Sequence, residues 1–218
     1  MNPSLFRPRR FALPPSLVLV PYFSQKSLFT SLQKQALRQQ DFLHSSLLWF
    51  ENMALISGFL GYPHLLTLLA LVDGLPDKEI YFLGSAGAVQ PKFREPAALQ
   101  VGEIRPGSIF KRFSRSRSLS LKVFRDAPAR FPVVSGVSVD IIQRETPGWL
   151  ATQRSLRTDI VEMELFPLRC FLRRPFHALV VLSDRVEPTG IRPFVEKQKF
   201  QREFAAAFAY IVSRIDHG

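Results

Sequence analysis

The fold of this chain is decided by residues 160–184, which read IVEMELFPLRCFLRRPFHALVVLSD. Residues 160–163 predict a short strand, and a helical pattern begins near Leu165. Residues 177–182 are a continuous apolar run that predicts a buried strand ending just before Asp184. A strand, a helix and a second strand in succession are typical of an α/β fold with a parallel or mixed sheet.

Carboxylates gather where these two strands end. Glu162 and Glu164 are two residues apart, so on an extended chain they point to the same side, whereas a helix that had already begun would separate them. Asp184 follows the apolar run and is either a helix N-cap or the acid of a pocket. Ligands of open α/β sheets collect at this edge, where an acid can protonate a leaving group. Both carboxylate clusters are therefore candidates for a site.

The same patterns continue outward along the chain. Apolar runs and helical spacing predict further elements, and Thr146 followed by Pro147 is a good start for one of the helices. We expect strands over residues 16–20, 46–50, 53–57, 79–83, 109–113 and 131–139, and helices over residues 24–39, 65–72, 147–156 and 195–215. Strands that alternate with helices, without an internal repeat or a linker, predict one α/β domain over residues 1–218.

The composition is that of an ordinary globular protein, with 218 residues, 46% hydrophobic and 22% charged. One cysteine, Cys170, excludes an internal disulfide framework, and its apolar helical surroundings predict a buried thiol. The net charge of +11 comes partly from the N-terminus and from a basic loop predicted over residues 111–130. No recognition-helix or RNA-type aromatic pattern accompanies this charge, so a nucleic-acid partner is not expected. The histidines have no metal-ligand spacing, and we expect no metal.

The N-terminus carries Arg7, Arg9 and Arg10 before an apolar stretch, as a signal peptide does. Pro14 and Pro15 interrupt that stretch, and no small-residue cleavage site follows. No apolar run reaches the roughly 20 residues of a membrane span. We therefore expect a cytoplasmic protein without a membrane partner, in which residues 1–15 are a loose extension.

Three blocks, in this order, carry a resemblance to a known family. The first is LGSAGAV at residues 83–89 with LQVGEI at residues 99–104, the second is Ser135-Gly136 at a strand end, and the third is VEME at residues 161–164 with the later Ser183-Asp184. Together they resemble the purine nucleoside phosphorylase superfamily, and most closely the methylthioadenosine/S-adenosylhomocysteine nucleosidases.

The resemblance implies a single-domain, three-layer α/β/α sandwich with a mixed, largely parallel central sheet. It also implies cleavage of the N-glycosidic bond of a purine-type nucleoside, without a cofactor, in a homodimer. Asp184 would act on the leaving base, and Glu164 would bind the ribose hydroxyls. The substrate-binding residues that it implies are Ser85, Gly87, Met163, Glu162, Ser183, Ser57 and Val139. Asp140, next to Val139, is a further candidate for contact with the base.

The sequence also departs from the family pattern. The nucleosidases carry a glutamate after the first strand that orients the attacking water, whereas residues 22–26 here read YFSQK. Val137 stands in place of an aspartate, and Val139 in place of an aromatic residue that would stack on the base. Two alternatives therefore stay open beside hydrolysis. One is a phosphate-dependent phosphorylase, with Lys26 and Arg105 as candidates for phosphate binding, and the other is a catalytically impaired relative that binds nucleosides.

Overall fold

The protein is described here from a computed structural model, which describes residues 12–21, 26–42, 45–58, 61–72, 74–107, 110, 117–140 and 146–217. Its strands are β1 Ser16–Val20, β2 Arg38–Asp41, β3 Ser46–Trp49, β4 Met53–Ser57, β5 Glu79–Ala88, β6 Ala98–Pro106, β7 Leu119–Ser120, β8 Val133–Ser138, β9 Ile160–Glu162, β10 His177–Glu187 and β11 Gly190–Pro193. Its helices are α1 Lys26–Gln35, α2 Gly61–Ala70, α3 Pro147–Ser155, α4 Leu165–Leu172 and α5 Lys197–His217, with a 3-10 turn at Leu75–Asp77.

All these strands belong to one mixed sheet with the order β11-β10-β6-β8-β9-β5-β1-β4-β3-β2, and β7 pairs with β6. The pairs β1–β4, β1–β5, β5–β10, β6–β8 and β8–β9 are parallel. Strand β10 pairs with both β5 and β6, so β5, β9, β8, β6 and β10 form a closed circuit. This closure brings the ends of β5, β8 and β9 close to β10.

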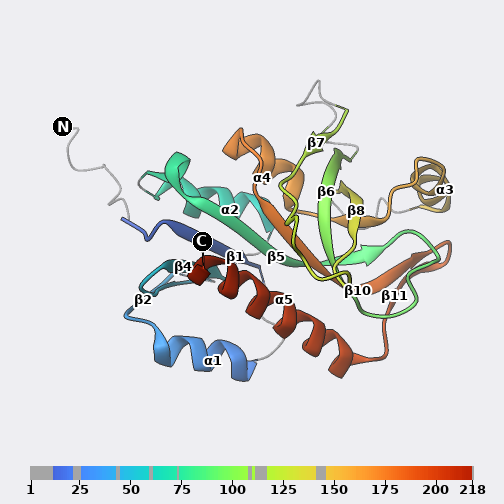
Figure 1. Ribbon diagram of the computed structural model, residues 1–218. Helices are drawn as coiled ribbons and strands as arrows, with labels where there is room; N and C mark the ends of the chain where they lie inside the picture. Colours follow the sequence, from blue (N-terminus) through green and yellow to red (C-terminus); the bar gives the residue numbers. More distant parts are fainter. Residues whose placement is uncertain are drawn as a thin grey trace.

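Helices cover both faces of the sheet (Figure 1). Strand β1 is buried throughout, and its side chains alternate between two cores because successive residues of a strand point to opposite faces. Leu17 and Leu19 pack in a core with residues of α2 and α4. Val18 and Val20 pack in a second core with residues of α1 and α5. The expected mixed α/β architecture is confirmed.

Several predicted elements have different limits in the structure. The helix predicted over residues 24–39 ends at Gln35, because the chain then forms β2 and pairs with β3. The strand predicted over residues 79–83 is longer, since β5 continues through the glycine-containing block to Ala88. Strand β6 was not predicted. The strand predicted over residues 109–113 lies outside the described residues, apart from Phe110.

The ends of the predicted basic loop and N-terminal extension are held in place. Within residues 117–130, β7 pairs with β6, and Phe124 N donates a hydrogen bond to Gln100 Oε1 over 2.9 Å. At the N-terminus, Lys78 Nζ donates to Leu13 O over 2.6 Å. Backbone and side-chain bonds therefore fix the described parts of these two segments. Within the described ranges, no helix is long and apolar enough to cross a membrane.

Candidate functional site

A cavity of about 160 Å³ opens where β5, β8, β9 and β10 come together. Its lining combines carboxylates, small residues and apolar side chains. The lining residues are Ser85, Ala86, Gly87, Val139, Val161, Glu162, Met163, Glu164, Ser183, Asp184 and Ile191. The cavity therefore lies at the strand-end position where α/β sheets bind ligands.

The nucleoside-binding residues expected from the sequence line this cavity, with the exception of Ser57 and Asp140. Ser57 is buried at the end of β4, which is separated from β5 by β1. Asp140 follows Val139, beyond the end of β8, and does not line the cavity. The structure thus brings together residues from four separate segments of the sequence and leaves these two candidates outside the cavity.

Glu162 is fixed by three hydrogen bonds. Its Oε2 accepts from Glu164 N over 2.6 Å and from Leu165 N over 2.7 Å, at the N-terminus of α4. Its Oε1 accepts from Ser138 Oγ, which in turn accepts from Phe166 N over 2.8 Å. Backbone N–H groups at a helix start have no partner within the helix, so this carboxylate caps α4. Glu162 therefore holds the segment that carries Glu164.

Glu162 and Glu164 form a coupled carboxylate pair. Burial raises the pKa of Glu162 to about 8, and the neighbouring Glu164 charge adds to the effect, while Ser138 and the backbone of Leu165 and Glu164 oppose it. Burial raises the pKa of Glu164 to about 7, against a hydrogen bond from the Met163 backbone. Two like charges in one partly buried site disfavour simultaneous ionisation. The pair therefore retains a proton more readily than exposed glutamates do.

Asp184 enters the cavity through an irregularity in β10. The pairing of β10 with β5 shifts register between Leu182 and Asp184, which leaves Ser183 as an extra residue. Ser183 Oγ donates a hydrogen bond to Asp184 Oδ2 over 2.6 Å. Burial raises the pKa of Asp184, and the bond from Ser183 lowers it. Asp184 is thus an oriented carboxyl group with a raised tendency to hold a proton.

Gly87 provides the space that Asp184 occupies. A Cβ at Gly87 would lie 2.8 Å from Asp184 Oδ1 and 3.1 Å from Val161 Cγ1. Gly87 is paired with Asp184 across β5 and β10, and with Val161 across β5 and β9. A side chain at this position would therefore displace the acid or narrow the cavity. The glycine of the sequence motif serves close packing rather than a turn.

The cavity is acidic on one part of its lining and apolar on another. Among the described residues that line it, the charged ones are carboxylates, and none is lysine or arginine. The apolar part continues into a small core formed by Val89, Val137, Val139, Leu150, Val161 and Val186, against which Met163 and Trp149 pack. Such a lining suits a neutral ligand with hydroxyl groups at one end and an apolar ring at the other.

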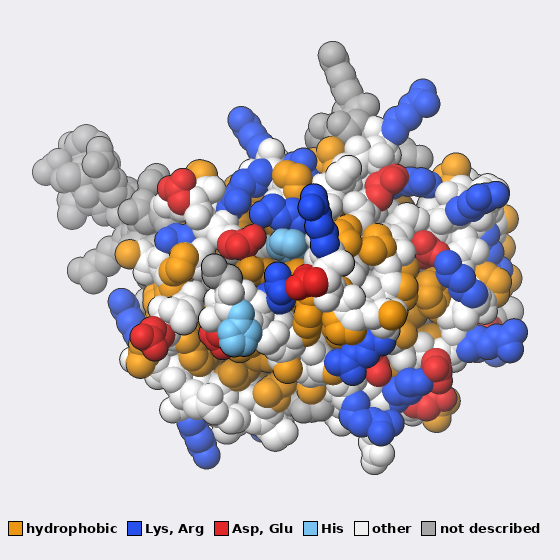
Figure 2. Space-filling view, viewed as in Figure 1, with side chains coloured by type: hydrophobic (Ala, Val, Ile, Leu, Met, Phe, Trp, Pro, Cys, Tyr) orange, Lys and Arg blue, Asp and Glu red, His pale blue; other side chains and the backbone are white. Residues whose placement is uncertain are grey.

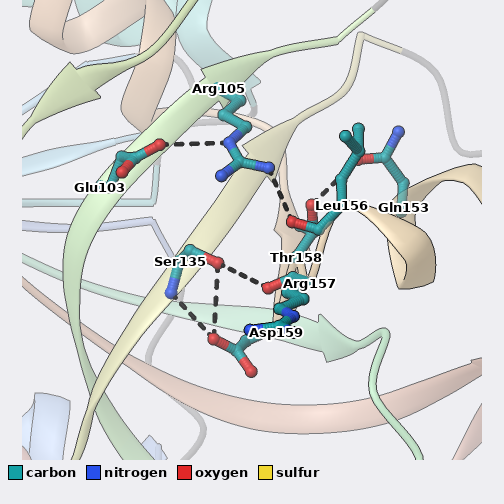
Figure 3. Close-up of polar contacts among 8 residues, drawn as sticks. All are labelled: Glu103, Arg105, Ser135, Gln153, Leu156, Arg157, Thr158 and Asp159. Atoms are coloured by element: carbon teal, nitrogen blue, oxygen red, sulfur yellow. Dashed lines mark hydrogen bonds and ion pairs between the residues drawn. The ribbon is translucent and has the colours of Figure 1, made fainter.

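The Ser135-Gly136 block does not line the cavity. Figure 3 shows the polar contacts that Ser135 makes instead. Ser135 Oγ donates to Arg157 O over 3.1 Å, and Ser135 N donates to Asp159 Oδ2 over 3.1 Å. Arg105, a candidate for phosphate binding, instead forms an ion pair with Glu103 and donates to Leu156 O over 3.0 Å (Figure 3). These residues fasten β6 and β8 to the turn between α3 and β9.

The remaining predictions on chemistry and charge have separate outcomes. Cys170 is exposed on α4, so the predicted buried thiol is wrong; the apolar stretch of this helix buries Leu165, Phe166, Pro167 and Leu168 instead. Figure 2 shows lysine and arginine side chains spread over the visible face among acidic ones, rather than in one patch. In the part of the chain that the structure describes, no cluster of three histidine, cysteine or acidic side chains could hold a metal ion.

Sequence reasoning missed Ala86, Val161 and Ile191 as lining residues. Ile191 was missed because β11 was not predicted, although Pro188 to Gly190 carries the residues of a tight turn. The pairing of β10 with β11 is what brings Ile191 to the cavity. The turn residues that directly follow β10 were the available sequence signal for β11.

The fold is similar to that of solved nucleosidases and of a nucleoside phosphorylase. A mutant futalosine hydrolase of Helicobacter pylori has 12% identity over 94% of this chain and 100% of that chain, with a TM-score of 0.69. A purine nucleoside phosphorylase of Toxoplasma gondii in complex with immucillin-H has 12% identity over 88% and 87% of the two chains, with a TM-score of 0.63.

A third similar structure is an MTAN of Chlamydia trachomatis bound to MTA. It has 16% identity over 94% of this chain and 99% of that chain, with a TM-score of 0.59. No protein-family model and no curated protein sequence matches the chain. At these identities the likeness shows the shared fold, and the chemistry has to be argued from the cavity.

Proposed function

We propose that this protein hydrolyses the N-glycosidic bond of a purine-type nucleoside. The observation that carries the proposal is the presence of Glu164 and Asp184 in one cavity, beside Ser85 and Gly87. Glu164 is delivered by the segment between β9 and α4, and Asp184 by β10. One ligand can therefore contact both carboxyl groups at once, as a nucleoside must if one of them binds the sugar and the other the base.

The two groups have complementary roles. Glu164, when ionised, accepts hydrogen bonds from the ribose hydroxyls and stabilises positive charge that develops on the sugar. Asp184, when protonated, gives its proton to a ring nitrogen of the base while the bond from that base to C1′ breaks. Water adds its oxygen to C1′ and releases one proton to solvent, from which Asp184 is reprotonated. The products are the free base and a sugar with a C1′ hydroxyl.

The charge of the lining favours water over phosphate as the nucleophile. Phosphate binding in proteins relies on arginine, lysine or clustered backbone N–H groups. The described lining offers Glu162, Glu164 and Asp184 and no cationic side chain. Lys26 and Arg105, which the sequence suggested for phosphate, do not belong to that lining. Glu164, which the mechanism requires to be ionised, repels a phosphate dianion, and no cationic side chain of the described lining offsets it.

The proposal is tested by incubating the purified protein with purine nucleosides in phosphate-free buffer and in phosphate buffer. The measured quantity is free base, separated by liquid chromatography. We expect release of base at the same rate in both buffers. Release of base that depends on phosphate would show that the reaction is phosphorolysis and not hydrolysis. No release, together with ligand-induced thermal stabilisation, would assign the protein to non-catalytic nucleoside binding.

Three structural expectations belong to the same proposal. The whole chain would form one domain, its helices and sheet would make a three-layer α/β/α sandwich, and two copies would associate. Helices on both faces of one sheet support the first two. Light scattering during size-exclusion chromatography measures the third directly: twice the 24.9 kDa chain mass is expected, and a mass of one chain would reject the dimer.

A further inference from the structure

We propose that Ile191, carried by the β10–β11 hairpin, is a specificity-determining residue that selects the edge of the leaving base beyond Asp184. This inference rests on the proposed function. Ile191 lines the cavity, and 38% of its surface is exposed in the absence of a ligand. The proposed preference is for a base that presents a C–H edge at this wall, and against one that carries an amino group there.

The order of strands places Ile191 at the base end of the cavity. Strand β9 pairs with β5, β5 pairs with β10, and β10 pairs with β11. The proposed sugar-binding Glu164 follows β9, whereas the proposed acid Asp184 lies on β10. A nucleoside that spans the cavity from β9 to β10 therefore directs the outer edge of its base toward β11.

The register of the hairpin puts Ile191 and Asp184 on the same face. Asp184 is opposite Pro193, and Val186 is opposite Ile191. Directly opposite residues of an antiparallel pair share a face, so Ile191 is a diagonal neighbour of Asp184 at about 7–8 Å. Val186 Cγ2 lies 3.4 Å from the position of a Cβ on Gly87. The apolar wall thus begins next to the acid.

Polar contacts fix the hairpin in this position. Glu187 bridges its two strands, with one ion pair to Arg185 at 3.1 Å and one to Arg192 at 2.9 Å. Phe194 N donates to Ser183 O over 3.0 Å, which ties the end of the hairpin to the residue that orients Asp184. A wall that is held at both ends discriminates between ligands better than a mobile loop.

The expected discrimination follows from unpaired polar groups. An amino group of the base that faces the Ile191 side chain loses its hydrogen bonds to water and gains none from the wall. Pocket discrimination of this kind amounts to about tenfold to a hundredfold in kcat/KM. Replacement of Ile191 by asparagine supplies a carbonyl oxygen to that amino group and removes the penalty. The sugar-binding end of the cavity is unaffected.

The test uses purine riboside and its 2-amino, 6-amino and 8-amino derivatives with the wild-type protein and the Ile191→Asn and Ile191→Ala variants. Val195→Ala is the control, because Val195 follows the hairpin but is 90% exposed and does not line the cavity. For each compound, the ratio of variant to wild-type kcat/KM cancels its intrinsic reactivity. We expect Ile191→Asn to raise this ratio about tenfold for one amino derivative relative to purine riboside. Val195→Ala should leave all ratios equal.

Equal ratios for all four compounds in both Ile191 variants, with unchanged thermal unfolding, would overturn the assignment. Thermal stabilisation of the same proteins by purine, 2-aminopurine, adenine and 8-aminopurine provides a readout that does not depend on turnover. If the wild-type protein cleaves no nucleoside but Ile191→Asn gains stabilisation by one aminopurine, hydrolysis fails and the role of Ile191 stands. If no base stabilises any of the proteins and no nucleoside is cleaved, both proposals fail.

Discussion

The carboxylate of Asp184 occupies the space above the backbone of Gly87, where a Cβ would approach its Oδ1 to 2.8 Å. Gly87→Ala should therefore push Asp184 out of position while the sheet stays intact. We expect kcat/KM to fall by about a hundredfold, because small misplacements of a catalytic group have effects of this size. Gly148→Ala is the matched control, since nothing lies within 4 Å of a Cβ there. Equal activity of the two variants would show that Asp184 is not the acid.

Removal of the proposed acid has a direct kinetic consequence. Asp184→Asn keeps the shape of the side chain but cannot donate the carboxyl proton, so turnover should fall by at least about a hundredfold. Steady-state kinetics with a cleaved nucleoside measure the effect, and thermal unfolding checks that the variant is folded. A rate within a factor of about two of the wild type would place the acid elsewhere.

The hydrogen bond from Ser183 should be visible in the pH profile. This bond lowers the pKa of Asp184 in opposition to burial. Activity that needs protonated Asp184 is lost as the pH rises through this pKa, and removal of the bond raises the pKa. Ser183→Ala should therefore move the alkaline limb of kcat against pH to higher pH. A shift of the alkaline limb to lower pH, or no shift, would contradict the assignment of this limb to the deprotonation of Asp184.

Much of this site was predictable, because strand ends in an α/β fold can be recognised from apolar runs and their polar ends. The sequence predicted Glu164 and Asp184 as a pair, and the three blocks of resemblance added Ser85 and Gly87. The structure places all four at one cavity. Local patterns succeed here because each of these residues sits on or next to a buried strand.

Other features depend on contacts that no local pattern encodes. Ile191 reaches the cavity only because β11 pairs back onto β10. The role of Glu162 depends on the start of α4 and on Ser138, which lies 24 residues earlier. Ser57 resembles a site residue locally, but the sheet order puts β1 between its strand and β5. Strand pairing, which is a tertiary choice, decides all three.

Ser138 should contribute to stability through Glu162. It is fully buried, donates to Glu162 Oε1 and accepts from Phe166 N. Ser138→Ala leaves a carboxylate oxygen and an N–H group without this partner, which costs about 1–3 kcal/mol of unfolding free energy. Urea denaturation measures the loss. Ser155→Ala, which removes an exposed hydroxyl bonded to Thr152 O, is the control and should change little. Equal losses of unfolding free energy in the two variants would mean that the buried hydrogen bonds of Ser138 stabilise the fold no more than the exposed one of Ser155.

Glu164 should make stability depend on pH. Its pKa is raised in the folded protein from 4.5 to about 7, so the unfolded chain loses its proton first and stability falls as the pH rises between these values. Glu164→Gln has no such ionisation. Relative to the wild type, its free energy of unfolding should be about 1–2 kcal/mol higher at pH 8 than at pH 5. A shift of one pKa unit corresponds to about 1.4 kcal/mol, and the expected value is smaller than the full shift would give because Glu164 is partly exposed.

Urea denaturation at the two pH values measures this change, and exposed Glu196, replaced by glutamine, is the control. A relative stability of Glu164→Gln that is the same at pH 5 and pH 8 would place the Glu164 carboxylate in water. It would also remove the basis for its role as a poised ligand of the sugar hydroxyls.

The central claim is hydrolysis at C1′, and the origin of the new oxygen on the sugar tests it most directly. The measurement is mass spectrometry of the sugar product after incubation of a purine nucleoside in H₂¹⁸O with phosphate present. We predict a free sugar that carries one ¹⁸O atom at C1′, together with an equal amount of free base. A sugar phosphate, or no sugar product from any purine nucleoside, would contradict hydrolysis.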